Sequence, residues 1–420
     1  MNDKSLPHTQ SSPHITIIGS ALSGNKGAAA MLESAIQTLG TEIPGARFTL
    51  LSMYPDEDRR QNSYENLEIV PASPRQLGVT INLLALLYRV LPPFRRLIRR
   101  NSRAIRALTS SQVLLDQGGI TFTDGREKFL LYNIASILPA MFVSTPVVKC
   151  AQAVGPFNNP VNRRAARYFL PKVHTIVTRG AKTHEFAKQL GLSNLQAGAD
   201  YAFSLELGGA EADQLQAELN LGFFDTGLIV GVSPSIVLQK KVDARGGDYV
   251  GQMVDFVNYL ITSGKRVVLI PHSARTGTSK THNNDLPLCQ EIYEHLTETE
   301  PVLFIDRELP SQALRYLIGR CDLFVASRFH AMVSALAMAV PTLVIGWSHK
   351  YQEVLEMFDA EEWAMGHDDL ELAQLIERFE ALASNRDRVA GTLAEHLPSV
   401  KQKSYEQAEL IARIVHSRLA

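Results

Sequence analysis

The feature of this sequence that most limits its fold is a series of short apolar runs, each followed by a stretch with helical periodicity. The runs are 14–20, 47–53, 112–119, 145–155 and 174–180 in the first half, and 227–235, 265–273, 301–306, 321–328 and 341–347 in the second. This alternation is typical of βαβ units, in which helices connect the strands of a parallel sheet. The pattern therefore predicts an α/β protein with two doubly wound, Rossmann-like domains.

A polar helical segment bounded by glycines separates the two series of runs and marks a domain boundary. We expect a disordered N-terminal tail over 1–13, an N-terminal domain over 14–205 and a C-terminal domain over 227–388. The last segment, 389–420, is predicted to form helices that pack back onto the first domain. Because ligands of doubly wound sheets bind beyond the carboxyl ends of the strands, the two domains are expected to face one shared cleft.

Composition excludes several other classes of protein. The chain has 420 residues, of which 45% are hydrophobic, and its formal net charge is −1. So small a net charge gives no general attraction to nucleic acid. The three cysteines lack CxxC spacing, which argues against a disulfide framework, and no cluster of carboxylates indicates a metal site. The first residues lack the order of a signal peptide, so we expect a cytoplasmic protein.

One segment of the first domain has an unusual distribution of charge. An apolar run over 77–94, too short to span a bilayer, leads into arginines with no acid among them. These arginines, which lie within 89–106, are Arg89, Arg95, Arg96, Arg99, Arg100, Arg103 and Arg106. Such a segment either lies on an anionic membrane surface or forms a buried helix followed by a solvated basic face. Peripheral contact with the inner face of the cytoplasmic membrane is one of these two interpretations.

Basic and titratable side chains recur where the predicted strands end. They are Arg179, His272, Arg328, His330 and Lys350. Arg328 and His330 stand at a strand-to-helix turn, where a cation opposes the helix dipole unless an anion binds the exposed amides. Arginines suit carboxylate or phosphate groups, and a histidine suits proton transfer near neutral pH. The set therefore predicts a site for a small polyanion at the ligand-facing edge.

Small residues follow two of the predicted strands in the first domain. Asn25 lies among glycines in "GSALSGNKGAAAM", and Gly118 and Gly119 follow "VLLD". Small residues let backbone amides approach an anion, although each stretch could equally form only a tight turn. The first loop fits neither GxGxxG nor GxxxxGK[ST], so neither a dinucleotide site nor a P-loop is predicted. The polar loop "ARTGTSKTHNN" that follows the His272 strand could act as a lid.

The chain resembles the polysaccharide pyruvyl transferase family over roughly residues 14–360. The resemblance rests on "GSALSGNKGAAAM", "DQGGITFTD", "AQAVGPF", "TRGAKT", "GADYAFSL" and, above all, "SRFHAMVSALAMAVPTLVIGWSHKYQEVLEMF". It implies a GT-B-like fold and transfer of the enolpyruvyl group of phosphoenolpyruvate onto two hydroxyls of a sugar. The sugar belongs to a cell-surface polysaccharide or its precursor, and phosphate is released. Phosphoenolpyruvate is the donor substrate, and no cofactor is implied.

The family's functional positions correspond to Arg179, Arg328 and His330 in this sequence. We assign anion binding to the two arginines and general acid catalysis to His330, with His272 as an alternative acid or base. The other positions assigned to substrate binding are Lys350, Asn25, Gly118 and Gly119. The sequence departs from the family where acids are usual, because Ala28 and Gly180 stand there instead.

Two other functions remain open at this stage. A GT-B glycosyltransferase that uses a nucleotide sugar would share the architecture and would place cations near a diphosphate. A catalytically silent family member would bind a glycan without releasing phosphate, and the absent acid in the first loop favours it. In each case the partner is a saccharide, and the basic segment over 89–106 is compatible with a lipid-linked one.

Overall fold

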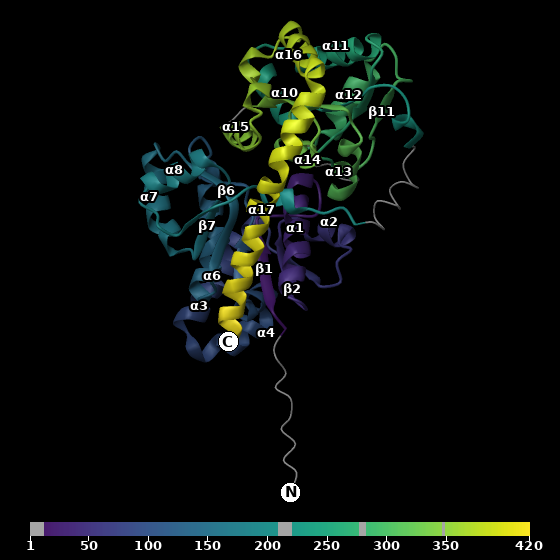
Figure 1. The fold of residues 1–420 in the computed structure, drawn as a ribbon. Helices are drawn as coiled ribbons and strands as arrows, with labels where there is room; N and C mark the ends of the chain where they lie inside the picture. Colours follow the sequence, from purple (N-terminus) through teal and green to yellow (C-terminus); the bar gives the residue numbers. More distant parts are fainter. Residues whose placement is uncertain (1–11, 209–220, 277–282, 347–348) are drawn as a thin grey trace.

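The computed structural model describes residues 12–208, 221–276, 283–346 and 349–420, and they form two α/β domains (Figure 1). Residues 1–11 of the predicted tail lie outside the described residues, as does 209–220 of the boundary segment. Residues 277–282 of the polar loop that we predicted as a lid also lie outside them.

Both sheets are parallel throughout. In the first domain the strand order is β3-β2-β1-β4-β6-β7-β8, with β5 paired to β6, and in the second it is β11-β10-β9-β12-β13-β14. The strands of the first domain are β1 (His14–Ile18), β2 (Arg47–Ser52), β3 (Leu67–Pro71), β4 (Val113–Asp116), β5 (Ile120–Thr123), β6 (Val147–Gly155), β7 (Thr175–Thr178) and β8 (Leu195–Ala197). Those of the second are β9 (Ile229–Ser233), β10 (Arg266–Leu269), β11 (Val302–Phe304), β12 (Leu323–Ala326), β13 (Thr342–Gly346) and β14 (Ala364–Gly366).

Helices connect the strands and cover the sheets. In the first domain they are α1 (Lys26–Glu42), α2 (Pro55–Gln61), α3 (Asn82–Val90), α4 (Arg95–Asn101), α5 (Arg103–Ser110), α6 (Leu130–Val143), α7 (Pro160–Phe169) and α8 (Ala181–Gln189). In the second they are α10 (Ile236–Asp243), α11 (Tyr249–Thr262), α12 (Leu286–Glu294), α13 (Ser311–Gly319), α14 (Phe329–Ala337), α15 (His349–Leu355) and α16 (Leu372–Ser384). The chain ends in one long helix, α17 (Arg386–Leu419), which runs from the second domain along the first (Figure 1).

Each predicted apolar run contains a strand, because a parallel strand covered by helices on both faces is apolar along its length. All nine residues of β6 are buried, for example. The strands that the pattern did not predict are β3, β5, β8 and β14, which lie at sheet edges or beside the main strand order. The edge strands β8 and β14 are only partly buried, so their sequences lack a continuous apolar run.

The strand order reverses at β1/β4 in the first domain and at β9/β12 in the second. At such a point the loops that follow adjacent strands diverge to opposite faces of the sheet and leave a crevice. The domains touch beside these crevices. Lys26 Nζ lies 2.8 Å from Glu308 Oε1 of the second domain, and Arg315 of α13 donates to the carbonyl of Ala202 (2.7 Å).

The helix α17 fastens the C-terminus to the first domain. The hydroxyl of Ser404 donates to the carbonyl of Asp200 (2.9 Å), and the amide of Gln407 donates to the carbonyl of Ala199 (2.9 Å). Ile411 is fully buried in the core that also contains residues of α1. The helix therefore supports the loop that carries Asp200.

We expect Ile411→Ala to lower the free energy of unfolding by about 2–5 kcal/mol, because it leaves a cavity between α17 and the first domain. The matched control is Arg413→Ala two residues along the same helix, where the side chain is exposed and the expected change is within about 0.5 kcal/mol. Urea unfolding of the full chain measures both values. Equal losses in the two variants would contradict the packing described for α17.

Candidate active site

A cavity of about 260 Å³ lies between the domains, where the two crevices meet. Its volume is slightly below the range of about 300–1,000 Å³ that is usual for drug-sized ligands, so it suits a small molecule. The predicted residues that line it are Asn25, Gly119, Arg179, His272, Arg328, His330 and Lys350. Gly118 is not among the lining residues, and its amide donates to the carboxylate of Asp116 (3.0 Å). The lining contains three arginines and one lysine but no acid.

Arg179 follows β7 and is 2% exposed. One terminal nitrogen of its guanidinium donates to Asp200 Oδ2 (2.9 Å), and the other donates to the carbonyl of Gly119 (2.8 Å). The ring of Phe329 from the second domain lies 4.5 Å from the guanidinium carbon. Among the described residues, the buried Nε has no hydrogen-bond partner. Arg179 is therefore held by a carboxylate while at least one of its donors stays available.

Arg328 precedes α14 and is held by Asp285, which is fully buried. Its Nε donates to Asp285 Oδ2 (2.7 Å), one terminal nitrogen donates to Asp285 Oδ1, and the other donates to Asn283 (2.7 Å). A guanidinium has five N–H groups, so two remain for a ligand. The edge formed by Nε and its neighbouring nitrogen already holds a carboxylate. Arg328 can therefore contact an anion only through its remaining donors.

His330 lies in the first turn of α14, against the first domain. Its Nε2 is 3.5 Å from Asp200 Oδ2, and Nε2 has no hydrogen bond within the described residues. Burial lowers the pKa of His330, and the charges of Arg179 and Lys350 lower it further, although Asp200 opposes the shift. The ring is therefore neutral near pH 7 in the free protein. To act as a general acid, His330 must first bind a proton, and an added negative charge beside it would favour that.

Asp200 is the residue that joins these groups, and its role was not predicted from the sequence. Burial alone would raise its pKa, but the contacts with His330, Arg179 and the amide of Ala202 hold that pKa well below its usual value. Arg179 is permanently charged, so this direction does not require a charge on His330. Asp200 is therefore a carboxylate that balances one cation of the site.

Like His330, His272 and Lys350 have pKa values that are shifted toward their neutral forms. Burial lowers the pKa of His272 well below 6.5, and the nearby His330 and Arg328 act in the same direction. Burial, followed by the charges of Arg179 and Arg126, lowers the pKa of Lys350 well below 10.5. The ammonium group of Lys350 lies 4.5 Å from the centre of the Phe329 ring. A bound anion would favour the charged forms of both side chains.

Several residues that line the cavity were not predicted from the sequence. Arg126 enters it from the loop after β5, and within the described part of the chain its guanidinium forms no hydrogen bond or ion pair. Burial lowers the pKa of Arg126. The other lining residues that we did not predict are Gly19, Ala28, Met31, Gln117, Ile120, Ser235, Phe329 and Tyr351. The position of Arg126 just after the quoted motif "DQGGITFTD" was a signal that could have indicated it.

At two positions, Ala28 and Gly180, the sequence lacks the acid that is usual in the family it resembles. The two positions have different surroundings in the structure. Ala28 lines the cavity itself. At Gly180, an added Cβ would lie 2.7 Å from the Cβ of Glu353. The carboxylate of Glu353 instead accepts from the amide (2.6 Å) and hydroxyl (3.1 Å) of Thr183 at the start of α8. A carboxylate from the second domain therefore occupies the space beside position 180.

In the described residues, no three His, Cys, Asp or Glu side chains are placed to hold a metal ion together. The groups that the cavity offers are hydrogen-bond donors, cations and two neutral imidazoles. Chemically, such a site can bind an anion and move protons.

A model of the family described as polysaccharide pyruvyl transferase matches residues 25–349, which is most of the chain. Solved structures of low identity share the fold. The UDP-GlcNAc 2-epimerase from Neisseria meningitidis bound to UDP-GlcNAc is 13% identical, with a TM-score of 0.63 over 96% of this chain and 100% of that chain. A UDP-GlcNAc 2-epimerase from Methanocaldococcus jannaschii is 13% identical, with a TM-score of 0.55 over 88% and 92%. These likenesses show the fold alone and confirm the predicted two-domain, GT-B-like architecture.

The buried histidines predict how stability depends on pH. The pKa of His272 and of His330 is lowered in the folded protein, so below about pH 6.5 the unfolded chain binds more protons than the folded one. We expect the free energy of unfolding to fall by up to about 1.4 kcal/mol per pH unit for each histidine as the pH drops below about 6.5. Urea unfolding between about pH 7.5 and 5.5 measures the slope. His272→Asn should reduce it, and the same change at the exposed His416 is the control.

The approach of His330 to α1 gives a second prediction. A Cβ at Gly27 would lie 2.0 Å from His330 Nδ1, whereas nothing lies within 4 Å of a Cβ added at Gly40 of the same helix. We expect Gly27→Ala to displace the imidazole and to cost about 1–3 kcal/mol of stability, as overpacking usually does. Gly40→Ala should be neutral or slightly stabilising. Thermal unfolding of both variants, with NMR of the His330 ring, measures this, and an unshifted ring in Gly27→Ala would contradict the geometry.

Proposed function

The chain belongs to the polysaccharide pyruvyl transferase family, and from this we propose that it transfers the enolpyruvyl group of phosphoenolpyruvate onto two hydroxyls of one sugar. The product is a pyruvate ketal on a cell-surface polysaccharide or its precursor, and phosphate is released. The observation that carries the proposal is the basic character of the cavity, whose lining has three arginines and one lysine but no acid. Phosphoenolpyruvate carries a carboxylate and a phosphate on three carbons, and it suits such a cavity in charge and in size.

The roles of the cations follow from what each is already bound to. Arg179 and Arg328 are held by Asp200 and Asp285, so each offers its remaining N–H groups to the donor. Arg126 forms no ion pair within the described residues, so its N–H groups are available to one anionic group, although its guanidinium lies over the Phe129 ring. An anion bound beside Arg126 would lower the free-energy cost of burying the three guanidinium charges. A donor with two anionic groups therefore suits the site.

The chemistry requires that protons move between the acceptor and the donor. Each of two sugar hydroxyls loses a proton as it bonds to the central carbon of phosphoenolpyruvate, and the bond from that carbon to the phosphate oxygen breaks. One proton ends on the methylene carbon, which becomes the methyl group, and the other ends on the departing phosphate. We assign delivery to the methylene carbon to His330, which takes up its proton when the anionic donor binds. His272 is the candidate to accept a hydroxyl proton, because it is buried and neutral.

Two alternatives remain within the same architecture. The solved UDP-GlcNAc 2-epimerases share the fold, so a nucleotide sugar is the competing donor. A silent member of the family would bind saccharide and no donor. We further propose that the protein acts in the cytoplasm, on a saccharide acceptor, and that it needs no cofactor.

Donor binding to the full chain tests the proposal. By calorimetry we expect phosphoenolpyruvate to bind and UDP-GlcNAc not to bind. Arg126→Gln should weaken the binding of phosphoenolpyruvate by about 1.5–3 kcal/mol, roughly 10- to 150-fold, which is the usual value of a charge-assisted hydrogen bond. The matched control is Lys128→Gln. Lys128 lies two residues after Arg126, is exposed and does not line the cavity.

The other outcomes are informative. Binding of UDP-GlcNAc in place of phosphoenolpyruvate would move the protein to the nucleotide-sugar enzymes, and binding of neither would favour the silent member. Equal losses in Arg126→Gln and Lys128→Gln would show that the cavity is not the donor site.

A further inference from the structure

One face of the first domain carries apolar side chains that the rest of the described chain does not cover. Val79, Leu83, Leu86 and Val90 are 66%, 51%, 39% and 55% exposed. Their spacing of four, three and four residues places them along one side of a helix. The same helical segment buries Leu77, Ile81 and Ala85 on its other side, so it has two apolar sides and only one is packed.

The exposed apolar surface continues beyond the end of α3. Leu91, Phe94 and Leu97 are 40%, 52% and 54% exposed, and they lie in the turn after α3 and in α4. We call the seven exposed residues from Val79 to Leu97 the apolar ridge. Continuous apolar patches on a protein surface mark sites that bind a partner or a membrane.

Arginines surround the apolar ridge and no acid lies in its stretch of sequence. Between residues 69 and 115 the chain contains eight arginines and neither Asp nor Glu. Arg103 pairs with Glu68 (2.6 Å), and Arg95 donates to the carbonyl of Tyr88 (2.9 Å). Within the described residues, no ion pair forms at Arg89, Arg96, Arg99, Arg100 or Arg106. A hollow of about 560 Å³ lies beside Tyr88, and it is lined by Arg95, Arg96, Arg99, Arg100 and Arg106.

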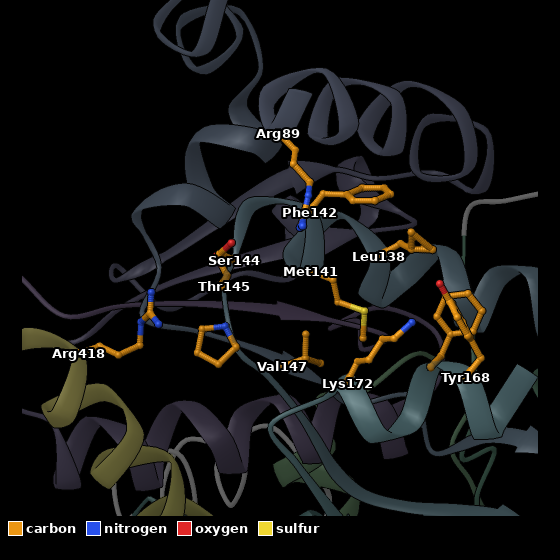
Figure 2. Close-up of a pocket in the computed structure, with 12 residues that line it drawn as sticks. Arg89, Leu138, Met141, Phe142, Ser144, Thr145, Val147, Tyr168, Lys172 and Arg418 are labelled. Atoms are coloured by element: carbon orange, nitrogen blue, oxygen red, sulfur yellow. The ribbon is translucent and has the colours of Figure 1, made fainter. Parts of the chain in front are cut away.

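A second hollow lies beside the same face. This cavity has a volume of about 650 Å³. Its lining includes Leu138 and Met141, and the side chains of Arg89, Lys172 and Arg418 lie around it (Figure 2). Arg89 lies at the end of α3, directly before Val90 of the apolar ridge, so the cavity lies beside the ridge. An apolar floor with cations at its rim matches an acyl chain with an anionic headgroup.

The position of the helices argues against a span across the bilayer. In the described chain, no single helix has the length and hydropathy of a membrane span, although Gln76–Val90 and Pro92–Asn101, bent by 119°, pass that test together. The first of these is packed on the domain, because the amide of Asn82 donates to the carbonyl of Ala135 in α6 (3.1 Å). A helix that is held on one side and apolar on the other suits the plane of a membrane surface.

We propose that the apolar ridge and its arginines dock the protein on a bilayer that contains anionic phospholipids. The apolar side chains enter the headgroup region, and the arginines contact lipid phosphates at the same depth. The charge favours a bilayer over a second copy of this chain, because two such faces would bring their unpaired arginines together. In Figure 1, α3 and α4 lie at the end of the first domain away from the second domain, so docking leaves the cleft between the domains open.

Flotation of the full chain with vesicles tests this proposal, and it needs neither donor nor acceptor. We expect the protein to float with phosphatidylcholine vesicles that contain about 30% phosphatidylglycerol and not with phosphatidylcholine alone. Raising the salt from about 0.1 M to about 0.5 M should release it, because the Debye length shortens. A combined Leu83→Ser, Leu86→Ser and Phe94→Ser variant should lose about tenfold or more in partitioning while its thermal unfolding stays unchanged.

The charge is tested separately from the apolar ridge. Arg96→Gln, Arg99→Gln and Arg100→Gln together should lower partitioning by roughly 100-fold, about fivefold for each arginine. The control removes three exposed arginines from the second domain and the start of α17: Arg320→Gln, Arg378→Gln and Arg388→Gln.

Three results would overturn the proposal. The first is an equal loss in the two arginine variants, which would show a general effect of charge. The second is that wild type fails to float with anionic vesicles at low salt. The third is a dimer of wild type that the serine variant converts to a monomer, because this would assign the apolar ridge to self-association.

Discussion

The structure of the cleft depends on how two guanidinium groups are buried. An unpaired charge in a protein interior costs several kcal/mol, so each arginine needs a carboxylate that is buried with it. Arg179 has Asp200, and Arg328 has Asp285. The first pair also joins the domains, because Phe329 lies against Arg179 and His330 lies 3.5 Å from Asp200. The candidate catalytic residues therefore lie close together only because the second domain packs against the first.

These two pairs leave the cavity positively charged. Two carboxylates balance two arginines, while Arg126 adds a further charge to the same small space. In the free protein, burial lowers the pKa of Lys350 and of His330, and the charge of Arg179 acts in the same direction. An anion reverses that balance, and proton uptake accompanies its binding. Binding of the anionic donor therefore also favours protonation of the group that is to deliver the proton.

The sequence supported the fold and part of the site for a definite reason. Apolar runs reveal strands that are buried on both faces, and the residues that follow such strands meet at one edge, so Arg179, Arg328 and His330 could be placed together. Their partners could not be assigned in the same way. Asp200 and Asp285 reach the arginines through loops whose paths depend on tertiary contacts, such as the hydrogen bond from Ser404 of α17 to the Asp200 carbonyl. The short, partly buried edge strands β8 and β14 left no pattern to detect.

The two departures from the family have different physical meanings. At Gly180 the missing side chain leaves space that the carboxylate of Glu353 fills from the second domain. At Ala28 the residue lines the cavity, and the lining contains no acid. A carboxylate there would repel an anionic donor and offset one of the cations. Its absence keeps the excess of positive charge, so the site stays suited to binding an anion.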